Sequence, residues 1–395
     1  MSAPFEYSDN QALIAELKEF RTLRELRASE AYQKHRAYIT ALLETPRLFP
    51  ANDAQPLVQD FVRIAQWNVE KGKQLDAVIE TFRSHPVLRY ADLISLNEAD
   101  VGMNCSGQRF VAHELGKALG MHVVFAPAYL EFSKGYGDDL LIPGENTIAL
   151  QGNAILSRYP LHHPRIIELP VCFNHFEHAE KRIGRRIAVA AEVEISGHQV
   201  SFVSAHLEVR NSPACRARQM AAIIADAEQA STSAAIIAGD FNTNTFVRGG
   251  LWRTVQAGMR IALANPERFA RQLAAPQTSE PLFALLERHG FIIEGFNNTE
   301  TTCRTQMRGF EDGSHLPQVL REAFERRLAR HNYQLDFRLD WITGRGVRPL
   351  EQSEVIDVAS SVASLPPQTI GGLKNEKGEM ISDHDPITVD LEIQR

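Results

Sequence analysis

Polar side chains stand at the ends of the apolar runs in this chain. The run AAIIAG leads into Asp240 and Asn242, and the run VSFVSA ends at His206. Short apolar runs with β-branched residues predict buried strands, and open sheets bind ligands at the ends of their strands. Carboxylates, amides and imidazoles bind hard cations and move protons, so we expect chemistry on a metal ion, a phosphate or a water there. The remaining members of the set are Asn68, Glu98, Asp340, Asp383 and His384.

A purely structural role is also open to each of these residues. Asp and Asn close turns by bonding their own backbone, which would account for Asp240 and Asn242 without any chemistry. A calcium loop is excluded, because Thr245 and Leu251 stand where that loop requires Gly and Glu. Structural roles for the rest would be a turn for Asn68, a helix start for Glu98, a satisfied buried ring for His206, an ion pair of Asp340 with Arg338 or Arg345, and a turn before Pro386 for Asp383 and His384.

The order in which these segments occur favours one shared site. Six segments, each at the mouth of a predicted strand, all deliver Asn, Asp, Glu or His. That coincidence is improbable for six unrelated turns. We therefore predict that the chain brings them together.

The elements that must position these residues begin near residue 61. Strands alternate with helices from there on, which predicts a sandwich of two mainly antiparallel sheets covered by helices. Residues 185–196 and 197–208 form a predicted hairpin about Gly197. Further strands are expected at 61–69, 91–99, 121–129, 146–158, 234–240, 339–347 and 387–393, with helices at 74–84, 108–119 and 217–230.

Two other regions surround this predicted body. Residues 1–60 form an expected helical extension, with one or two amphipathic helices in 9–45 capped near Ser8 or Asp9. It would pack on the body as an accessory lobe or offer a helix to a partner. Residues 246–335 hold twelve Arg, no Lys and nine Asp or Glu, with helices expected at 281–291 and 316–332. This insert is either a solvated helical lobe or a substrate-facing one in which Arg grips phosphate.

Composition limits the classes of function. The chain has 395 residues, a formal net charge of -7 and a pI near 6.1, which argues against coating nucleic acid through bulk positive charge but leaves room for a local basic groove. No apolar run is long enough to span a membrane, and the acidic N-terminal segment lacks the apolar core of a secretory signal. The four cysteines are widely spaced, which disfavours a zinc–cysteine site and a dense disulfide framework. We expect free thiols, a cytoplasmic location and a monomer.

Seven motifs together resemble the endonuclease/exonuclease/phosphatase superfamily. They are QWNV, LNEADVG, GNAILSRYPL, SAHLE, AGDFNTNT, LDWITGR and SDHDP, and they extend over most of residues 62–393. The resemblance implies a DNase I-like α/β (α+β) fold, a four-layer αββα sandwich with pseudo-twofold symmetry, and metal-dependent cleavage of phosphate esters. Mg²⁺ is the implied ion, with Mn²⁺ as its substitute. SAHLE is more similar to the branch with sphingomyelinases, inositol-phosphate phosphatases and DNase-like enzymes than to the apurinic-site nucleases.

The resemblance also implies a role for each matching residue. Glu98 would be the principal metal ligand with Asn68 beside it, and Asp383 would hold the metal or its waters. Asp240 would orient or deprotonate the attacking water. The remaining roles would be a phosphate contact from Asn242, a second phosphate contact from His206, and stabilisation of the phosphorane by His384 oriented by Asp340.

Two features bear on substrate binding. Arg185 and Arg186 lie in a basic run beside a strand, which is either solvated or grips phosphate. Trp341 is bulkier than the family pattern and would form the rim of the pocket. The family pattern Gln-Glu is here Asn97-Glu98, which keeps the carboxylate.

The substrate class stays open between nucleic acid, a lipid head group and a small phosphate ester. A nuclease of the same superfamily is the alternative to a general phosphoesterase. An inactive scaffold would lack at least one of the site positions, and none is missing. A calcineurin-like metallophosphatase is excluded because its Asp-x-His and Gly-Asn-His motifs do not occur in the right context.

Overall fold

The structure is a computed structural model of the whole chain. It describes residues 7–135, 137–247, 265–306, 334–351, 355–357 and 360–393, together with single positions between 252 and 260 and between 318 and 329. Most of the predicted helix 316–332 lies outside the described residues.

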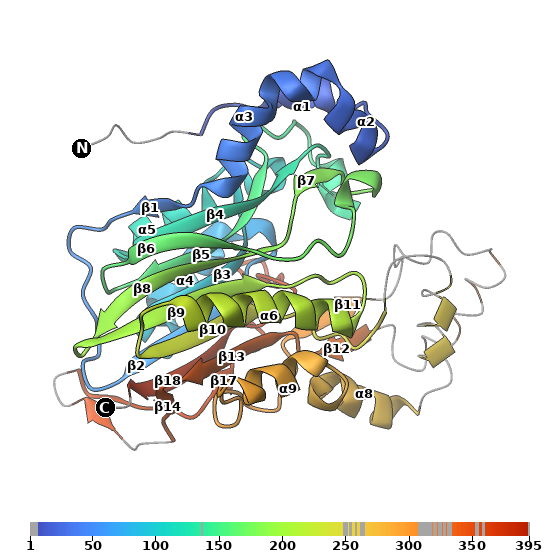
Figure 1. The fold of residues 1–395 in the computed structure, drawn as a ribbon. Coiled ribbons are helices and arrows are strands. Elements are labelled where there is room, and N and C mark those ends of the chain that lie inside the picture. The colour runs from blue at the N-terminus through green and yellow to red at the C-terminus, as the bar shows by residue number, and fades with distance from the viewer. Residues whose placement is uncertain are drawn as a thin grey trace.

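Two mixed sheets form the centre of the molecule (Figure 1). The larger sheet has the order β1-β4-β5-β3-β2-β18-β14, with β7 paired to β4 and β17 paired to β18. Its strands are β1 (Arg47–Phe49), β2 (Val62–Asn68), β3 (Leu93–Val101), β4 (His122–Glu131), β5 (Leu150–Ser157), β7 (Arg182–Gly184), β14 (Val347–Pro349), β17 (Gln368–Thr369) and β18 (Ile387–Ile393).

The smaller sheet repeats the strand pattern of the larger one. Its order is β13-β10-β9-β8-β6, formed by β6 (His162–Glu168), β8 (Ile187–Ile195), β9 (His198–His206), β10 (Ala234–Asp240) and β13 (Asp340–Arg345). In β18-β2-β3-β5-β4 and in β13-β10-β9-β8-β6 the neighbours pair antiparallel, parallel, antiparallel and antiparallel. The repeat is the pseudo-twofold relation that the family resemblance implies.

Helices cover the outer face of each sheet, which makes four layers. The sheets face each other through an apolar core, and α4 (Leu75–Ser84) and α5 (Val111–Leu119) cover the larger sheet. The smaller sheet is covered by α6 (Pro213–Gln229) and α9 (Pro281–Arg288). The mixed α/β sandwich expected from the sequence is confirmed.

Helix α4 illustrates why these segments fold as they do. Leu75, Val78 and Phe82 recur at helical spacing, so they form one apolar face. Phe82 packs on Trp67 of β2, with ring centroids 5.8 Å apart. Burying each such side chain contributes about 1.5–3 kcal/mol.

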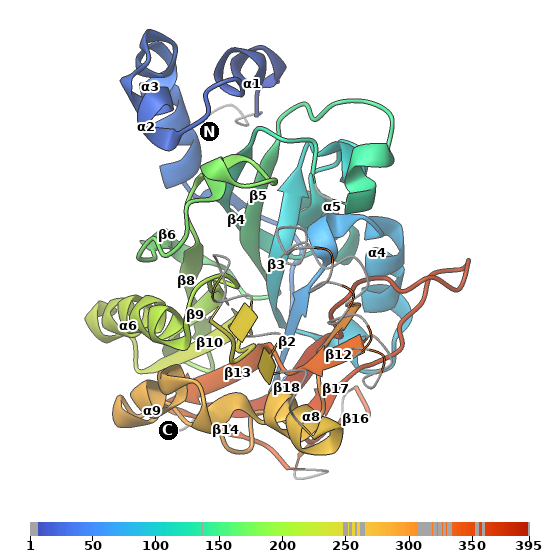
Figure 2. The same cartoon turned by 90° about the vertical axis from the view of Figure 1, so that its right-hand side faces the viewer.

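The N-terminal residues form three helices rather than one or two. They are α1 (Gln11–Leu17), α2 (Leu23–Ala28) and α3 (Glu30–Glu44), and they lie above the larger sheet in Figures 1 and 2. The cap of α1 is Asn10, which differs from the expected Ser8 or Asp9. The extra helix arises because Thr22 and Glu25 form a capping box that starts α2. The domain boundary at residue 60 stays a prediction.

The described part of the insert contains α8 (Pro266–Ala274), α9 and β11 (Cys303–Gln306), which pairs antiparallel with β12 (Gln334–Phe337). The helix expected at 281–291 corresponds to α9. A two-stranded ribbon is formed by β15 (Ile356–Asp357) and β16 (Val362–Ala363). None of the helices in the described residues is both long and apolar enough to cross a membrane.

A buried ion pair fixes β18 to β2. Arg63 donates from Nε and Nη2 to the two carboxylate oxygens of Asp390, each at 2.7 Å, and the two residues are register partners. Because β18 follows the SDHDP segment, this pair also fixes that segment relative to the end of β2.

Candidate active site

One edge of the two sheets collects the polar strand ends. Strands β2 and β3 run parallel, as do β9 and β10, so their carboxyl ends meet at this edge. The antiparallel neighbours β13 and β18 begin there. In register, Asp240 lies between His206 and Asp340. Figure 2 is viewed from the side at which β10 ends.

Gly239 allows β10 to approach β9 closely just before Asp240. A Cβ at this position would lie 1.9 Å from the carbonyl oxygen of Ala205, so no other residue fits. The backbone N–H of Asp240 donates to Asn97 Oδ1 at 2.8 Å across the interface between the sheets. The carboxylate is thereby held in a fixed place at the sheet edge.

Three side chains surround the Asp240 carboxylate. Asn68 Nδ2 donates to Asp240 Oδ2 at 3.2 Å. His206 Nε2 and His384 Nε2 lie 3.4 and 3.9 Å from the same oxygen. Burial raises the pKa of the Asp240 carboxyl to about 7, and the neighbouring Asp340 carboxylate adds to the shift. The structure thus brings Asn68, His206 and His384 to within 4 Å of the Asp240 carboxylate.

Asp340 orients His384. Asp340 Oδ2 accepts from His384 Nδ1 at 2.7 Å, and Asp340 is fully buried. Burial alone would lower the pKa of His384, but Asp340 and other neighbouring acids outweigh it and hold that pKa well above its usual value. A protonated ring held in this way presents Nε2 as a donor toward the centre of the site.

Thr302 supports this dyad, and the sequence prediction missed it. Its hydroxyl donates to Asp340 Oδ2 at 2.6 Å and accepts from the backbone N–H groups of Leu339 and Asp340 at 3.0 and 3.1 Å. Thr302 lies in the insert, far from Asp340 in the sequence, so no local pattern could have indicated the contact.

His206 is held by Arg186. The guanidinium Nη1 lies 2.9 Å from His206 Nδ1 and 2.7 Å from Nε2, and both residues are buried. Burial lowers the pKa of His206 well below its usual value, and the Arg186 charge adds to this effect. The ring is therefore neutral, and the positive charge on this side of the site belongs to Arg186.

A bulge in β3 turns Glu98 toward the site. The register with β5 shifts between Leu96 and Ala99, and Glu98 has a φ of 55°. Asn97 instead points between the sheets, where its Oδ1 also accepts from Gln66 Nε2 at 2.9 Å. The change from Gln to Asn at position 97 therefore affects a contact between the sheets and leaves Glu98 at the edge.

Asp383 lies near Glu98 and Glu70. The residue as a whole is exposed, but partial burial of its carboxyl raises the pKa to about 6, and the charges of Glu70 and Glu98 add to the shift. The backbone N–H of Asp383 donates to Glu70 Oε2 at 3.2 Å. Glu70 was not predicted from the sequence, because it follows Asn68 within a helical turn and no strand pattern marks it.

This group of oxygens fits a hard divalent cation. The charges of Glu70 and Glu98 raise the pKa of Asp383, so a positive ion between the three carboxylates would stabilise the group, and Mg²⁺ prefers oxygen ligands. Asn68 adds an amide next to this group, although its Oδ1 already accepts from the Glu70 N–H at 3.1 Å. The residues present therefore suit the implied ion.

Asn242 sits in the turn that follows β10. Its backbone N–H donates to Asp240 Oδ1 at 2.9 Å, and its side-chain Nδ2 donates to the carbonyl oxygen of Leu207 at 2.9 Å. Asn242 has a φ of 51°, a conformation that Asn tolerates better than most residues. It joins the ends of β9 and β10.

Two residues predicted to bind substrate lie elsewhere. Trp341 is 1% exposed, packs on Phe283 of α9 with ring centroids 4.6 Å apart, and donates to Thr243 Oγ1. It belongs to the core under the smaller sheet, so the prediction of a pocket rim is wrong: the side chains of a strand alternate, and Trp341 faces the helix layer. Arg185 is half-buried and paired with Glu168, whereas its neighbour Arg186 is buried.

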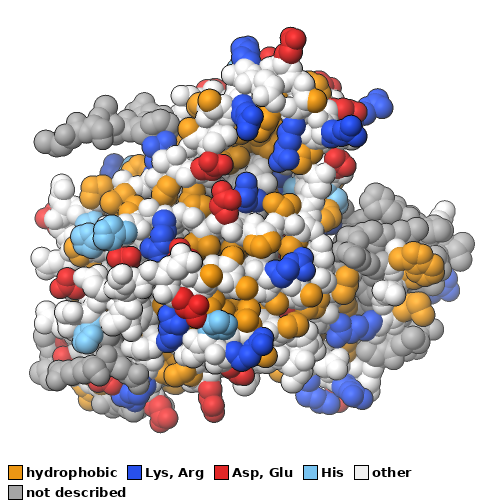
Figure 3. All heavy atoms as spheres, viewed as in Figure 1, with side chains coloured by type: hydrophobic (Ala, Val, Ile, Leu, Met, Phe, Trp, Pro, Cys, Tyr) orange, Lys and Arg blue, Asp and Glu red, His pale blue; other side chains and the backbone are white. Residues whose placement is uncertain are grey.

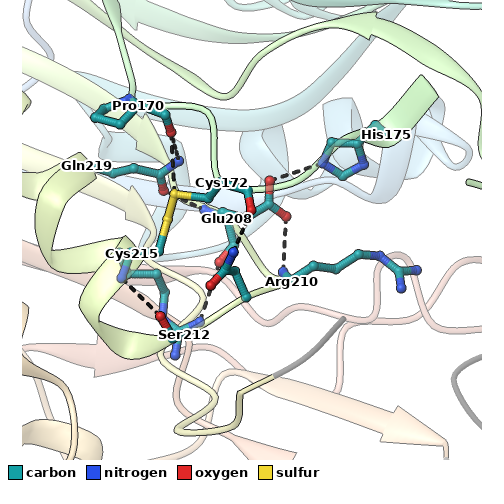
Figure 4. The surroundings of a disulfide bond; sticks show 10 residues. Pro170, Cys172, His175, Glu208, Arg210, Ser212, Cys215 and Gln219 are labelled. Atoms are coloured by element: carbon teal, nitrogen blue, oxygen red, sulfur yellow. Dashed lines mark hydrogen bonds and ion pairs between the residues drawn. A yellow bond between two sulfur atoms is a disulfide. The ribbon is translucent and has the colours of Figure 1, made fainter. Parts of the chain in front are cut away.

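A disulfide closes the margin beside Arg186. Cys172, in the loop after β6, is bonded to Cys215 in the first turn of α6 (Figure 4). The expectation of free thiols is therefore wrong for these two cysteines, because the fold brings together residues that are 43 positions apart; Cys105 and Cys303 are free.

A chain of buried polar contacts runs beside the disulfide toward the site. His175 Nε2 lies 3.0 Å from Glu208 Oε2, and Arg182 Nη2 lies 3.2 Å from His175 Nδ1 (Figure 4 shows His175 and Glu208). Burial, aided by Arg182, lowers the pKa of His175 to about 4. The neutral imidazole of His175 therefore lies between the guanidinium of Arg182 and the carboxylate of Glu208.

Comparisons with known proteins identify the family of the chain. The model of the Endonuclease/Exonuclease/phosphatase family matches residues 65–384. The chain belongs to this family. Its name covers enzymes that cleave phosphate esters. No curated protein matches the chain.

Solved structures of similar fold share little sequence with this family member. A Beutenbergia cavernae endonuclease/exonuclease/phosphatase is 13% identical, with 85% of this chain and 72% of that chain covered and a TM-score of 0.47. D. rerio TDP2 complexed with a single-strand DNA product is 15% identical, with 84% and 99% covered and a TM-score of 0.46. The Neisseria meningitidis 3'-5' exonuclease NExo is 15% identical, with 85% and 100% covered and a TM-score of 0.43. At these values the likeness says nothing about the substrate of this chain.

Proposed function

We propose that the protein is a magnesium-dependent phosphoesterase that uses water directly as the nucleophile. One observation carries the proposal: Asn68, His206 and His384 converge on the carboxylate of Asp240, next to the oxygen ligands Glu98 and Asp383. Cys303, the thiol beside His384, has its pKa raised to about 11 by burial and is therefore a poor nucleophile, so attack by water is the simplest chemistry.

The protonation state of each residue determines its proposed role in the reaction. Asp240, with a pKa near neutrality, accepts a proton from the attacking water. His384, held protonated by Asp340, donates to a phosphoryl oxygen as negative charge develops there. Arg186 gives a fixed positive charge behind the neutral ring of His206.

Glu98, Asp383 and Asn68 are the residues that would hold Mg²⁺, or Mn²⁺ in its place. The ion, when bound, neutralises a phosphoryl oxygen and stabilises the leaving group. A phosphate ester is anionic and repels an incoming nucleophile, so this neutralisation lowers the main electrostatic part of the barrier.

The substrate class is not fixed by the centre itself. Figure 3 shows basic and acidic side chains interspersed over the face drawn there, which disfavours a continuous basic surface on that face. A nuclease activity stays the alternative, and a monomer stays the expected state. The cytoplasmic location rested on free thiols, and the Cys172–Cys215 bond removes that support.

An activity screen with matched variants tests the proposal. The purified protein is given an aryl phosphodiester, an aryl phosphomonoester, DNA, RNA and phospholipid vesicles, each with Mg²⁺ or Mn²⁺ and each with a chelator control. We expect hydrolysis of at least one class that stops on chelation and falls by about 10²–10⁴ in Asp240→Asn and His384→Gln. Full activity in either folded variant would contradict the proposal, whereas Asp226→Asn on α6 serves as a control outside the site.

A further inference from the structure

The further inference concerns Cys303, a buried free cysteine beside the catalytic dyad. Cys303 begins β11 and forms an isolated antiparallel bridge with His384. The next residue, Arg304, donates its backbone N–H to the carbonyl oxygen of Asp383 at 3.1 Å. Directly opposed residues of such a bridge place their Cβ atoms about 5 Å apart on one face. The thiol and the imidazole are thereby held together by backbone contacts.

Cys303, His384 and Asp383 form a compact set of metal ligands. The thiol sulfur, one ring nitrogen and one carboxylate oxygen all lie within 4.8 Å of one another. Among the described residues, these three are the His, Cys, Asp and Glu side chains whose ligand atoms come this close together as a group of at least three. Ligands of a tetrahedral zinc ion stand about 3.5–4 Å apart, so the three side chains need to close by no more than about 1 Å.

The ring of His384 is already oriented as in known metal sites. Its Nδ1 bonds Asp340 Oδ2 at 2.7 Å, which leaves Nε2 for another ligand. Histidines that bind metals commonly donate their second N–H to a carboxylate, because this fixes the tautomer and makes the binding nitrogen more basic. Thr302 in turn fixes Asp340.

We propose that Cys303, His384 and Asp383 form a site for a soft divalent cation, Zn²⁺ or Cd²⁺, that overlaps the catalytic centre and inhibits it. The binding part stands on the geometry alone, and the inhibition part rests on the function proposed above. A thiolate and an imidazole favour Zn²⁺ and Cd²⁺, whereas Mg²⁺ requires oxygen ligands. The two ions would therefore use different neighbours of Asp383 and exclude each other.

Binding changes the protonation of two ligands without any redox step. The Cys303 thiol loses its Sγ proton and forms the sulfur–metal bond, and the His384 imidazolium loses its Nε2 proton and forms the nitrogen–metal bond; both protons go to solvent. Burial raises the pKa of the Cys303 thiol to about 11, so the thiol is neutral until a cation displaces its proton. Once His384 Nε2 is bound, it can no longer donate to a phosphoryl oxygen.

Cadmium absorption tests the binding directly. The full-length protein, freed of metal by a chelator and kept without reductant so that Cys172–Cys215 stays bonded, is titrated with Cd²⁺ while the ultraviolet thiolate-to-metal charge-transfer band is recorded. Zn²⁺ affinity is measured by calorimetry. We compare the native protein with Cys303→Ser, with Cys303→Ala, which removes the ligand with little change in volume, and with Cys105→Ser, which removes the other free thiol.

We expect one Cd²⁺ per chain and a band that disappears in both Cys303 variants but persists in Cys105→Ser. The loss of a ligand should weaken Zn²⁺ binding by at least the 10–100-fold that follows loss of a ligand's supporting hydrogen bond. A band that survives in a folded Cys303 variant, or the absence of any band in the native protein, overturns the proposal.

Activity gives a separate readout for the inhibition. Zn²⁺ should inhibit the Mg²⁺-driven hydrolysis of the native protein, with relief by added chelator, and the Cys303→Ala protein should need at least 10-fold more Zn²⁺. If the band appears but no phosphate ester is ever cleaved, the proposed function fails while the metal site stands. If hydrolysis occurs and Zn²⁺ acts equally on both proteins, the inhibitory role fails while the proposed function stands.

Discussion

Replacing Thr302 by Val tests whether the Asp340–His384 dyad depends on a residue of the insert. The substitution keeps the shape of the side chain but removes the hydroxyl that donates to Asp340 Oδ2 at 2.6 Å. A hydrogen bond to a charged group contributes about 1.5–3 kcal/mol, and each 1.4 kcal/mol is a factor of ten. We therefore expect kcat to fall by about 10–100-fold, with little change in KM.

The same substitution leaves two backbone donors without their acceptor. The N–H groups of Leu339 and Asp340 both bond the Thr302 hydroxyl, and an unsatisfied buried donor costs about 1–3 kcal/mol. The free energy of unfolding, measured by urea denaturation, should therefore fall by about 2–6 kcal/mol. Activity is assayed well below the new unfolding midpoint, so that the loss of kcat is separated from the loss of folded protein.

Two control variants make this result interpretable. Thr302→Ser retains the hydroxyl and should keep kcat within a few-fold of the native value, although it loses a buried methyl group. Thr301→Val, at the half-buried neighbouring position, should change little. A folded Thr302→Val protein with native kcat, or a Ser variant as poor as Val, would refute the reasoning.

Three further predictions concern separate parts of the molecule. Asp240→Asn should lower kcat by about 10²–10⁴ without loss of the folded state, as checked by single-turnover hydrolysis and circular dichroism; an unchanged rate would exclude Asp240 as the proton acceptor. Asp390→Asn should reduce the free energy of unfolding by about 3–5 kcal/mol in urea, because it leaves the buried Arg63 guanidinium without its counter-charge; a change under 1 kcal/mol would show that water reaches the pair. His175 has a pKa of about 4 when folded and 6.5 otherwise, so the unfolded chain binds its proton first and stability falls, by up to about 3 kcal/mol, as the pH drops from 6.5 to 4. Urea titrations of the native protein and of His175→Gln at pH 4 and 7 should show a smaller loss of stability at pH 4 in the variant. An equal loss in both proteins would exclude a contribution from His175.

The sequence predicted the strand ends well because their patterns are local. An apolar run followed by Asp240 or His206 marks both the strand and its edge, so the fold class and the convergence of Asn68, Asp240 and His384 could be anticipated. Trp341 could not be placed, because a tryptophan within a strand gives no sign of which face it occupies. Arg185 and Arg186 likewise carry the same charge in the sequence, and only their places in the short connection between β7 and β8 separate the buried residue from the half-buried one.

Contacts across long stretches of chain were beyond prediction. Thr302 meets Asp340, and Cys172 meets Cys215, because separate segments are packed against one another. Neither partner carries a spacing signal. The third helix of the N-terminal extension was missed for a different reason: the capping box at Thr22 was hidden within a continuous helical period.

Polar contacts between the two sheets have a mechanical consequence. Ser95 of β3 donates to Ser204 of β9 at 2.8 Å, and Asn97 accepts from the backbone of Asp240, next to the apolar side chains that pack between the sheets. Purely apolar faces can slide by a fraction of a residue at little cost in free energy. The same slip here would leave these buried polar atoms without hydrogen-bond partners, which is costly. The proposed metal ligand Glu98 belongs to one sheet and Asp240 to the other, so these contacts set the alignment between the cation and the water it would help to activate.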